Sequence, residues 1–490
     1  MNPDRWIERI LARHRDWQNG HGDSPHHPSL GVDENVLARA LDELADRLAG
    51  SHPFFHPRYA GQMIKPPHPV AVLGYLAGML VNSNNHALDG GPATSRLEVE
   101  AVAALAAMLG FGTHLGHLTG GGTVANLEAL FVARETHPDR GIAFSTEAHY
   151  THARMCHLLG VPAHPVPVDR NGRMDLDALR SLLATGTVGT VVATAGTPAL
   201  GAVDPVHDIL PLARAHGSRV HVDAAYGGFF ALLARGDTPP LVDPAPWRAV
   251  ASCDSVVIDP HKHGLQPYGC GAVLFADPSV ARFYDHDSPY TYFTSNLPHL
   301  GETSLECSRP GAAAAALWLT LKVLPLTRDG LGEVLAAGRR AALRWSTLLR
   351  DSADLCLFQQ PELDIVTYYP RCDPPTLSQI DRASASLLDE GMRDQRDPVY
   401  LSTSHIPADA FIARQLSVVT DRPRARILRS VLMKPESETY LGHLHRRVEA
   451  LARAPRPAPA AADPHSALDP SRSPAPPGRN LTVPPGKEAG

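Results

Sequence analysis

Ser255-Val-Val-Ile-Asp-Pro-His-Lys-His-Gly264 is an apolar, β-branched run that leads directly into a lysine between two histidines. The run predicts a short buried strand at 254–258. Lys262 is one of only five lysines among the 45 lysine and arginine residues of the chain. A primary amine can form a Schiff base with an aldehyde, and a guanidinium cannot. The segment therefore suggests a covalent anchor for an aldehyde cofactor. The alternative is a surface-loop lysine, the commoner case for a residue considered alone.

The surrounding sequence predicts an α/β fold with a mostly parallel sheet. Short apolar runs at 142–145, 189–194, 219–223 and 254–258 indicate buried strands, and helical patterns cover 97–110, 124–134 and 312–324. Apolar runs that are separated by helices and lack strict alternation are typical of a parallel sheet covered on both faces. Ligands bind such sheets beyond the carboxyl ends of the strands, which is where Lys262 falls.

A glycine-rich segment, His117-Leu-Thr-Gly-Gly-Gly-Thr-Val-Ala-Asn126, precedes one of the predicted helices. Glycines let backbone amides approach an anion, and the start of a helix favours negative charge. Gly121, Gly122 and Thr123 are therefore candidates for a phosphate-binding cradle. The segment lacks the Gly-Lys-Ser/Thr ending of a P-loop, and a glycine turn that only caps the helix accounts for it equally well.

Asp223 ends the predicted strand 219–223 and opens the motif Asp223-Ala-Ala-Tyr-Gly-Gly228. A buried carboxylate at that position needs a cationic partner. The protonated pyridine nitrogen of pyridoxal phosphate (PLP) is such a partner, and Ala224 and Ala225 would leave room for its flat ring. A helix N-cap aspartate is the alternative, but the motif is more specific than a cap.

His149, in Ala148-His-Tyr-Thr151 after the strand at 142–145, is a candidate to stack on the ring face opposite Ala225. Considered by itself, it is more often a satisfied loop histidine. The 26 histidines include close pairs such as His149/His152 and His261/His263. Because no His-Glu-x-x-His helix and no Cys/His quartet occurs, we predict no metal site.

In this order, the four segments resemble the group II PLP-dependent amino-acid decarboxylases, over about residues 52–453. Four stretches, at 53–61, 82–85, 121–130 and 259–262, are most similar to the bacterial tyrosine decarboxylase branch. The resemblance implies the PLP-dependent transferase fold type I. It also implies an obligate homodimer whose active sites lie at the subunit interface.

The resemblance assigns roles to residues of this chain. Lys262 corresponds to the Schiff-base lysine, and Asp223 to the aspartate that pairs with the pyridine nitrogen. His149 corresponds to the stacked histidine, and Ala225 to the small residue on the other ring face. The phosphate-loop positions and the histidine beside the lysine fall on Gly121, Gly122, Thr123 and His261.

The resemblance also implies a proton donor. In the family, a tyrosine on a mobile loop protonates Cα after CO₂ leaves. The corresponding loop here is 284–304, in which Tyr290 and Tyr292 are the candidates and Tyr292 is favoured. Relatives without this acid can let the carbanion react with O₂ and release an aldehyde, so an oxidative outcome stays open.

Two departures from the family pattern concern the substrate. Gly196-Thr-Pro198 stands where Gly-Thr-Thr is usual, and Asp89-Gly-Gly-Pro92 replaces an acidic-Ala-Ser-Pro stretch expected near the substrate pocket. The aromatic residues Phe54, Phe55 and Tyr59 fit either an apolar pocket lid or plain core.

Four segments are expected along the chain. Residues 1–75 form a helical segment that packs on the partner subunit and includes an amphipathic helix at 33–48. Residues 76–330 form the large PLP-binding domain, and 331–453 a smaller C-terminal α+β domain. The tail 454–490 is rich in proline and alanine, a composition typical of disorder.

Composition limits the other functional classes to which the protein could belong. The net charge is −6, which favours neither nucleic acid nor an anionic membrane as a partner. Six scattered cysteines without a Cys-x-x-Cys pair, and a charged N-terminus, indicate a cytoplasmic protein. The longest apolar stretch, 69–81, is too short to span a bilayer.

The sequence therefore predicts a PLP-dependent decarboxylase of an L-amino acid, with an aromatic, tyrosine-like substrate favoured. The alternatives are an acidic substrate such as glutamate or aspartate, or an oxidative or carbon–carbon lyase reaction on PLP. A third alternative is a catalytically silent protein of the same fold. Such a protein would not need both Lys262 and Asp223, so their presence argues against it.

Overall fold

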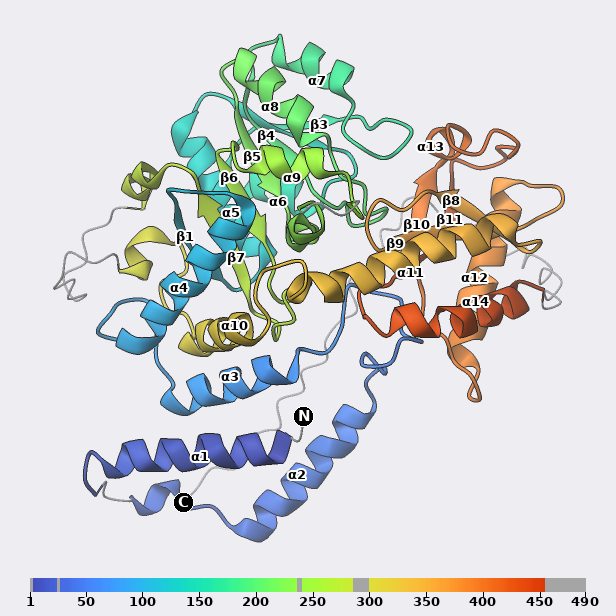
Figure 1. Ribbon diagram of the computed structural model, residues 1–490. Helices are drawn as coiled ribbons and strands as arrows, with labels where there is room; N and C mark the ends of the chain where they lie inside the picture. Colours follow the sequence, from blue (N-terminus) through green and yellow to red (C-terminus); the bar gives the residue numbers. More distant parts are fainter. Residues whose placement is uncertain (1–2, 24–26, 236–239, 285–298, 454–490) are drawn as a thin grey trace, which may run out of the picture. The chain divides into compact units, whose positions relative to one another are not determined.

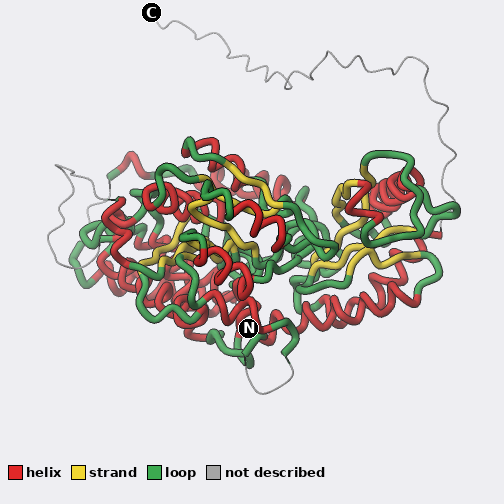
Figure 2. Tube along the Cα trace, turned by 90° about the horizontal axis from the view of Figure 1, so that it is seen from above, coloured by secondary structure: helices red, strands yellow, loops and turns green. Residues whose placement is uncertain are grey.

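A computed structural model describes residues 3–23, 27–235, 240–284 and 299–453 of the chain (Figure 1). Residues Met1–Arg453 pack as one compact unit, and its strands form two separate groups when the chain is seen from above (Figure 2). The predicted boundaries at 75/76 and 330/331 stay predictions, and the tail 454–490 lies outside the described residues.

The larger sheet has seven strands in the order β1-β7-β6-β5-β4-β2-β3. The pairs β2/β3, β2/β4, β4/β5 and β5/β6 are parallel, and β7 is antiparallel to both β1 and β6. The expected mostly parallel sheet is thus confirmed. The strands are β1 (Leu115–Thr119), β2 (Gly141–Ser145), β3 (Ala163–Val166), β4 (Val188–Thr194), β5 (Arg219–Asp223), β6 (Ser255–Ile258) and β7 (Gly271–Phe275).

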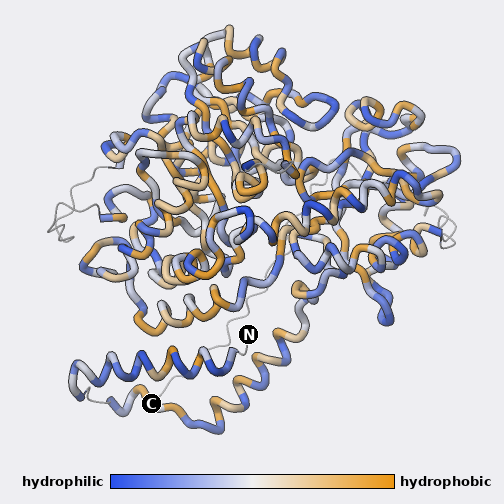
Figure 3. Tube along the Cα trace, viewed as in Figure 1, coloured by the Kyte–Doolittle hydropathy of each residue, from blue (hydrophilic) through white to orange (hydrophobic). Residues whose placement is uncertain are grey.

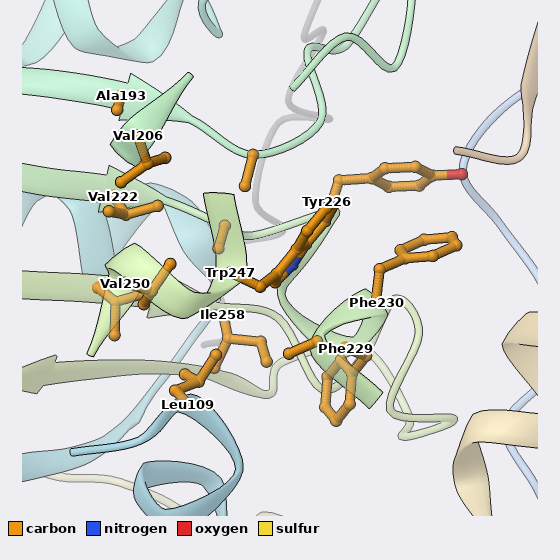
Figure 4. Close-up of a cluster of buried hydrophobic side chains, with 14 of the residues drawn as sticks. Leu109, Ala193, Val206, Val222, Tyr226, Phe229, Phe230, Trp247, Val250 and Ile258 are labelled. Atoms are coloured by element: carbon orange, nitrogen blue, oxygen red, sulfur yellow. The ribbon is translucent and has the colours of Figure 1, made fainter. Parts of the chain in front are cut away.

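Both faces of this sheet are buried, which explains the uninterrupted apolar runs of its strands. In β6, Val256 and Ile258 join one hydrophobic cluster and Val257 joins another, because successive side chains point to opposite faces. Figure 4 shows part of the first cluster, where Val222 and Ile258 meet Trp247 and Val250. Helix α4 (Pro92–Leu109) precedes β1. The later helices of this part are α5 (Gly122–Thr136), α6 (Thr151–Leu159), α7 (Leu176–Leu183), α8 (Val206–Ala215) and α9 (Pro244–Val250), with 3₁₀ turns η2 (Gly228–Leu233), η3 (Pro278–Phe283) and η4 (Leu300–Thr303).

The smaller sheet is antiparallel, in the order β10-β11-β9-β8. The long helix α11 leads from the larger sheet into this part of the chain (Figure 1). Helices and an antiparallel sheet together confirm the expected α+β character. The elements are α11 (Leu331–Asp351), β8 (Leu355–Gln359), β9 (Ile365–Pro370), α12 (Leu377–Arg393), β10 (Ser402–Pro407), α13 (Ala408–Ile412), β11 (Arg424–Val431) and α14 (Ser437–Arg453).

The apolar stretch 69–81 is helix α3 (Pro69–Val81), which packs closely along α10 (Gly311–Val323). Two glycines make this approach possible, because a Cβ on Gly74 or Gly78 would lie within 2.8 Å of an α10 backbone atom. Among the described residues, no helix is both long and apolar enough to cross a membrane.

The N-terminal segment comprises α1 (Pro3–Asn19), the 3₁₀ turn η1 (Pro28–Leu30) and α2 (Glu34–Ala49). The Asp33 side chain caps α2 by accepting hydrogen bonds from the amides of Asn35 and Val36, so the predicted helix at 33–48 is confirmed. No residue of α2 is buried, although apolar and charged residues alternate along it (Figure 3).

Candidate active site

The carboxyl ends of β4, β5 and β6 border a cavity of about 670 Å³. Side chains from the smaller sheet complete its wall. All eight residues predicted to bind the cofactor line this one cavity: Gly121, Gly122, Thr123, His149, Asp223, Ala225, His261 and Lys262. The structure therefore brings together residues that are spread over more than a quarter of the chain.

Lys262 enters the cavity from the turn that follows β6. Its Nζ lies 3.0 Å from Oδ2 of Asp259, and its side chain is 20% exposed. Burial opposes the charge on Lys262, but the carboxylates of Asp259 and Asp223 outweigh it and hold the lysine pKa above its usual value. Lys262 therefore rests as an ammonium group in contact with the Asp259 carboxylate.

Asp223 is the last residue of β5, and its carboxylate is buried. Nε2 of His152 lies 2.8 Å from Oδ2, and the amide of Ala225 donates to Oδ1 over 3.2 Å. Burial alone would raise the pKa of Asp223, but the contact with His152 and the charge of Lys262 hold it well below its usual value. The cavity thus contains a carboxylate that stays ionised and can face a cationic ring nitrogen.

The glycine-rich segment turns from β1 into the first turn of α5. Gly121 precedes α5 in a left-handed conformation, with φ of 143°, and offers no side chain to cap the helix amides. A Cβ on Gly122 would lie 2.6 Å from Oδ2 of Asp259. The helix N-terminus is thereby left open toward the cavity, beside the hydroxyl-bearing Thr123, an arrangement that suits a phosphate group.

The two predicted histidines lie in the cavity wall. Nδ1 of His149 is 2.8 Å from Oγ1 of Thr151, and burial lowers the pKa of His149 below its usual value. The ring of His261 stacks on Tyr268, with 4.6 Å between centroids, and burial likewise lowers the pKa of His261. Both imidazoles are therefore neutral at neutral pH.

The arrangement fits a phosphorylated aldehyde whose ring carries a protonatable nitrogen. The open α5 N-terminus suits the phosphate, Lys262 the aldehyde carbon, and Asp223 the ring nitrogen. Two buried polar atoms beside these groups, Oδ1 of Asp259 and Nδ1 of His261, have no hydrogen-bond partner among the described residues. The three anchoring groups and the two unpartnered atoms together fit PLP.

Several functional candidates were not identified from the sequence. His152 supports Asp223 from the first turn of α6, a role that only the spacing of the His149/His152 pair hinted at. Arg429 reaches the cavity from β11, where its Nη1 donates to the carbonyl of Gly61 and the hydroxyl of Ser402, each over 3.1 Å. Nothing in the local sequence distinguishes Arg429 from the other arginines.

Some expectations are not met within the described residues. The two candidate proton donors, Tyr290 and Tyr292, lie in 285–298, outside the described residues. Tyr59 is buried against Phe54, with ring centroids 4.8 Å apart, and Phe55 is 71% exposed. None of these three aromatic residues lines the described cavity, and Tyr59 belongs to the core, so the pocket-lid interpretation stays a prediction for Phe54 and Phe55.

The two departures from the family pattern differ in position. Pro198 lines the cavity, whereas no residue of Asp89–Pro92 does, because Gly91 ends that turn as the N-cap of α4. The second stretch does not border the cavity within this chain, and its expected place near the substrate pocket stays a prediction. No group of three or more potential metal ligands occurs in the described parts of the chain.

Comparison with known proteins agrees with this site. Residues 50–369 match the pyridoxal-dependent decarboxylase conserved domain. The chain is 31% identical over 334 residues to the probable L-tyrosine/L-aspartate decarboxylase of Methanothermobacter thermautotrophicus, covering 66% of this chain and 85% of that protein. It is 29% identical over 420 residues to the L-tyrosine decarboxylase of Enterococcus faecium, covering 66% and 69%.

The fold also has solved neighbours. The crystal structure of mouse CSAD superposes with a TM-score of 0.74 at 21% identity, covering 92% of each chain. That likeness concerns the fold alone, whereas the conserved-domain match extends over most of the residues described above. The chain belongs to the pyridoxal-dependent decarboxylase family and is a PLP-dependent amino-acid carboxy-lyase of fold type I.

Proposed function

We propose that this enzyme decarboxylates an aromatic, tyrosine-like L-amino acid to its amine and CO₂. The observation that carries the proposal is the apolar part of the cavity wall. Met63, Ile64 and Pro198 present apolar surface there, and Tyr268 adds an aromatic ring that stacks on His261. Such a wall suits a flat apolar side chain better than a second carboxylate.

The proposed roles of Lys262 and Asp223 rest on the geometry, and those of His149, Ala225 and Tyr292 on the family resemblance. Bound PLP would supply an electron sink for the electron pair left when the bond from Cα to the carboxylate breaks and CO₂ departs. Lys262 would hold the cofactor, and Asp223 would keep its ring nitrogen protonated. His149 and Ala225 would flank the ring, and Tyr292 would deliver a proton to Cα.

A second candidate, decarboxylation of aspartate or glutamate, is favoured by one observation. Arg429 is 6% exposed, lines the cavity, and makes no ion pair within the described residues. A buried guanidinium without a carboxylate partner is suited to bind one from a ligand. The relative named a probable L-tyrosine/L-aspartate decarboxylase is consistent with either candidate, whereas the one named an L-tyrosine decarboxylase favours the first.

We also propose a homodimer, in which the N-terminal segment packs on the partner subunit. The support is α2, whose apolar stripe is uncovered: Val36, Leu37, Leu41, Leu44 and Leu48 are each 46–62% exposed. A stripe of this kind on a single helix indicates a surface that another chain covers.

The test is a mass-spectrometric product assay in air and under nitrogen. Purified protein with PLP is incubated with L-tyrosine, L-DOPA, L-tryptophan, L-phenylalanine, L-aspartate and L-glutamate. We expect tyramine or another aromatic amine, with little product from the acidic substrates. Products from aspartate or glutamate alone would replace the proposal by the second candidate.

Two variants sharpen the assay. Replacing Arg429 with Met should lower turnover of an acidic substrate far more than that of an aromatic one, so each substrate is the control for the other. Replacing Tyr292 with Phe should slow amine formation about a hundredfold and divert product to the aldehyde in air. An aldehyde from the parent protein, or an unchanged product in the Phe variant, would show that Tyr292 is not the acid.

A further inference from the structure

Asp364 is a fully buried carboxylate at the junction of the two sheets. It precedes β9, and its carbonyl accepts the amide of Leu432 over 2.9 Å. Nη1 of Arg339 donates to the carbonyls of Pro361, over 2.9 Å, and Leu363, over 2.8 Å. The backbone that carries Asp364 is therefore fixed from α11 and from the strand end beyond β11.

The Asp364 carboxylate faces the larger sheet, not its own. The hydroxyl of Tyr226 donates to Oδ1 over 2.5 Å, and Nε2 of His263 lies 3.4 Å from Oδ2. The rings of Tyr226 and His263 meet edge to face, with 4.7 Å between centroids. Asp364 thus contacts two side chains that belong to separate turns of the larger sheet.

These two turns are the ones that carry the proposed cofactor residues. Tyr226 directly follows Ala225, and His263 directly follows Lys262. Figure 4 shows Tyr226 beside Phe230, with its hydroxyl directed away from the strands. Moving the Tyr226 or His263 side chain would therefore displace a residue that lies against the cofactor.

We propose that Asp364 is a positioning residue that anchors the Ala225 and Lys262 turns to the smaller sheet and so fixes their spacing in the cavity. The proposal rests on the roles assigned above to Ala225 and Lys262. Asp364 does not line the cavity. It acts through the hydroxyl of Tyr226, against whose ring His263 packs edge to face.

The ionised Asp364 carboxylate does not add to the stability of the folded chain. Burial raises the pKa of Asp364 to about 6, against the hydrogen bond from Tyr226 and the charges of Lys65 and Arg339. Between its usual pKa and 6, the folded chain holds a proton that the unfolded chain has released. The folded state therefore loses stability as pH rises through that window, and ionised Asp364 disfavours folding at pH 8.

The contact with His263 does not offset that effect. Burial, with the charges of Lys65 and Lys262, holds the pKa of His263 well below its usual value, so the ring is neutral. Neither Oδ2 of Asp364 nor Nε2 of His263 makes an aligned hydrogen bond within the described residues. The hydrogen bond from Tyr226 is consequently the contact to remove in a test.

Asp364→Asn, Tyr226→Phe and the double variant test the proposal, each with a matched control. Tyr368→Phe removes a buried tyrosine hydroxyl that bonds Ser430 over 3.0 Å, and Asp381→Asn neutralises a buried carboxylate of α12. The dissociation constant for PLP is measured from the absorbance of the bound cofactor. The melting temperature of the PLP-free proteins is measured at pH 8.

We expect Tyr226→Phe and Asp364→Asn each to raise the dissociation constant for PLP about tenfold. The dissociation constant of the double variant should not exceed the larger of the two single-variant values, because both substitutions remove the same hydrogen bond. PLP-free Asp364→Asn should melt no lower than the parent. The two controls should bind PLP as the parent does. If Asp364→Asn fails to fold, the comparison of Tyr226→Phe with Tyr368→Phe decides alone.

Unchanged PLP binding in Tyr226→Phe, an equal loss in the controls, or additive losses in the double variant would overturn the positioning role. The proposed function is tested separately by Lys262→Arg. If that variant still binds PLP covalently, the assigned cofactor anchor is wrong whatever the Asp364 variants show. If Lys262→Arg behaves as expected and Tyr226→Phe binds PLP normally, only the positioning role is wrong.

Discussion

Lys262 is the residue on which the chemistry depends, and its replacement by arginine separates charge from covalency. Arginine keeps a cation beside Asp259 but cannot form a Schiff base. We expect borohydride reduction in the presence of PLP to add one cofactor mass to the parent and none to Lys262→Arg. Lys322→Arg, which changes an exposed surface lysine, should behave as the parent. An adduct on Lys262→Arg would mean that another lysine is the anchor.

His149 should set the acidic limb of the pH profile. Burial lowers its pKa from the usual 6.5, so the neutral imidazole persists below that pH and becomes cationic only on further acidification. We expect kcat/KM to fall at a midpoint below pH 6.5. His149→Gln should lower kcat about tenfold and lose this limb. If kcat/KM of the variant falls at the same pH as that of the parent, another group is responsible for the acidic limb.

Site residues could be predicted from the sequence where a motif directly follows the end of a strand. Lys262, Asp223 and the glycines follow apolar runs, and parallel strands deliver such residues to one edge. His152 and Arg429 were not predictable for a physical reason. His152 supports Asp223 from α6, and Arg429 enters from a sheet that is distant in sequence, so no local pattern connects either residue to the site.

At the level of elements, the start of α5 carries the most specific prediction. A Cβ on Gly122 would stand 2.6 Å from the Asp259 carboxylate, so Gly122→Ala must displace Asp259 or the cradle itself. We expect the dissociation constant for PLP to rise at least about tenfold. PLP titration monitored by absorbance measures the change.

Gly442→Ala in α14 is the control for that substitution. The nearest atom to its added Cβ is Nη1 of Arg446, at 3.6 Å, so nothing has to move. The change should leave PLP binding unaltered and stabilise the helix by about 0.5–1 kcal/mol. Equal PLP affinity of the two alanine variants would exclude the α5 N-terminus as the phosphate site.

Strands β2, β4, β5 and β6 and helices α2, α4, α5 and α10 followed from periodicity and apolar runs, whereas β1, β3 and β7 of the larger sheet were not predicted. The four strands of the smaller sheet did not follow from such patterns either. They were expected only through the family resemblance. Strands β8 and β10 are only partly buried, and polar residues interrupt the apolar residues of β9 and β11. Local sequence thus specifies the larger sheet better than the smaller one.

On the scale of the molecule, the cavity is a product of both sheets. Residues of β10 and β11 face the strand ends that hold Lys262 and Asp223, and Asp364 ties the two sheets together behind them. Sequence motifs specify only the larger-sheet half of such a site. The other half depends on how the chain folds back, which no motif reports.

The uncovered stripe of α2 yields the last prediction. Leu41 and Leu44 are 54% and 51% exposed on a helix with no buried residue. Each leucine buried against a partner contributes about 1.5–3 kcal/mol. The variant carrying both Leu41→Glu and Leu44→Glu should therefore weaken the proposed homodimer at least about a hundredfold, measured by sedimentation velocity over a range of concentrations.

The control is Arg39→Glu on the opposite, charged side of the same helix, which adds negative charge without touching the stripe. It should sediment as the parent. If the double leucine variant also keeps the parent's mass at every concentration, α2 does not form the interface. Loss of the dimer in both variants would point to charge, not to the apolar stripe. If the interface is apolar, only the double leucine variant should lose the dimer, because only that variant places charge in a buried apolar contact.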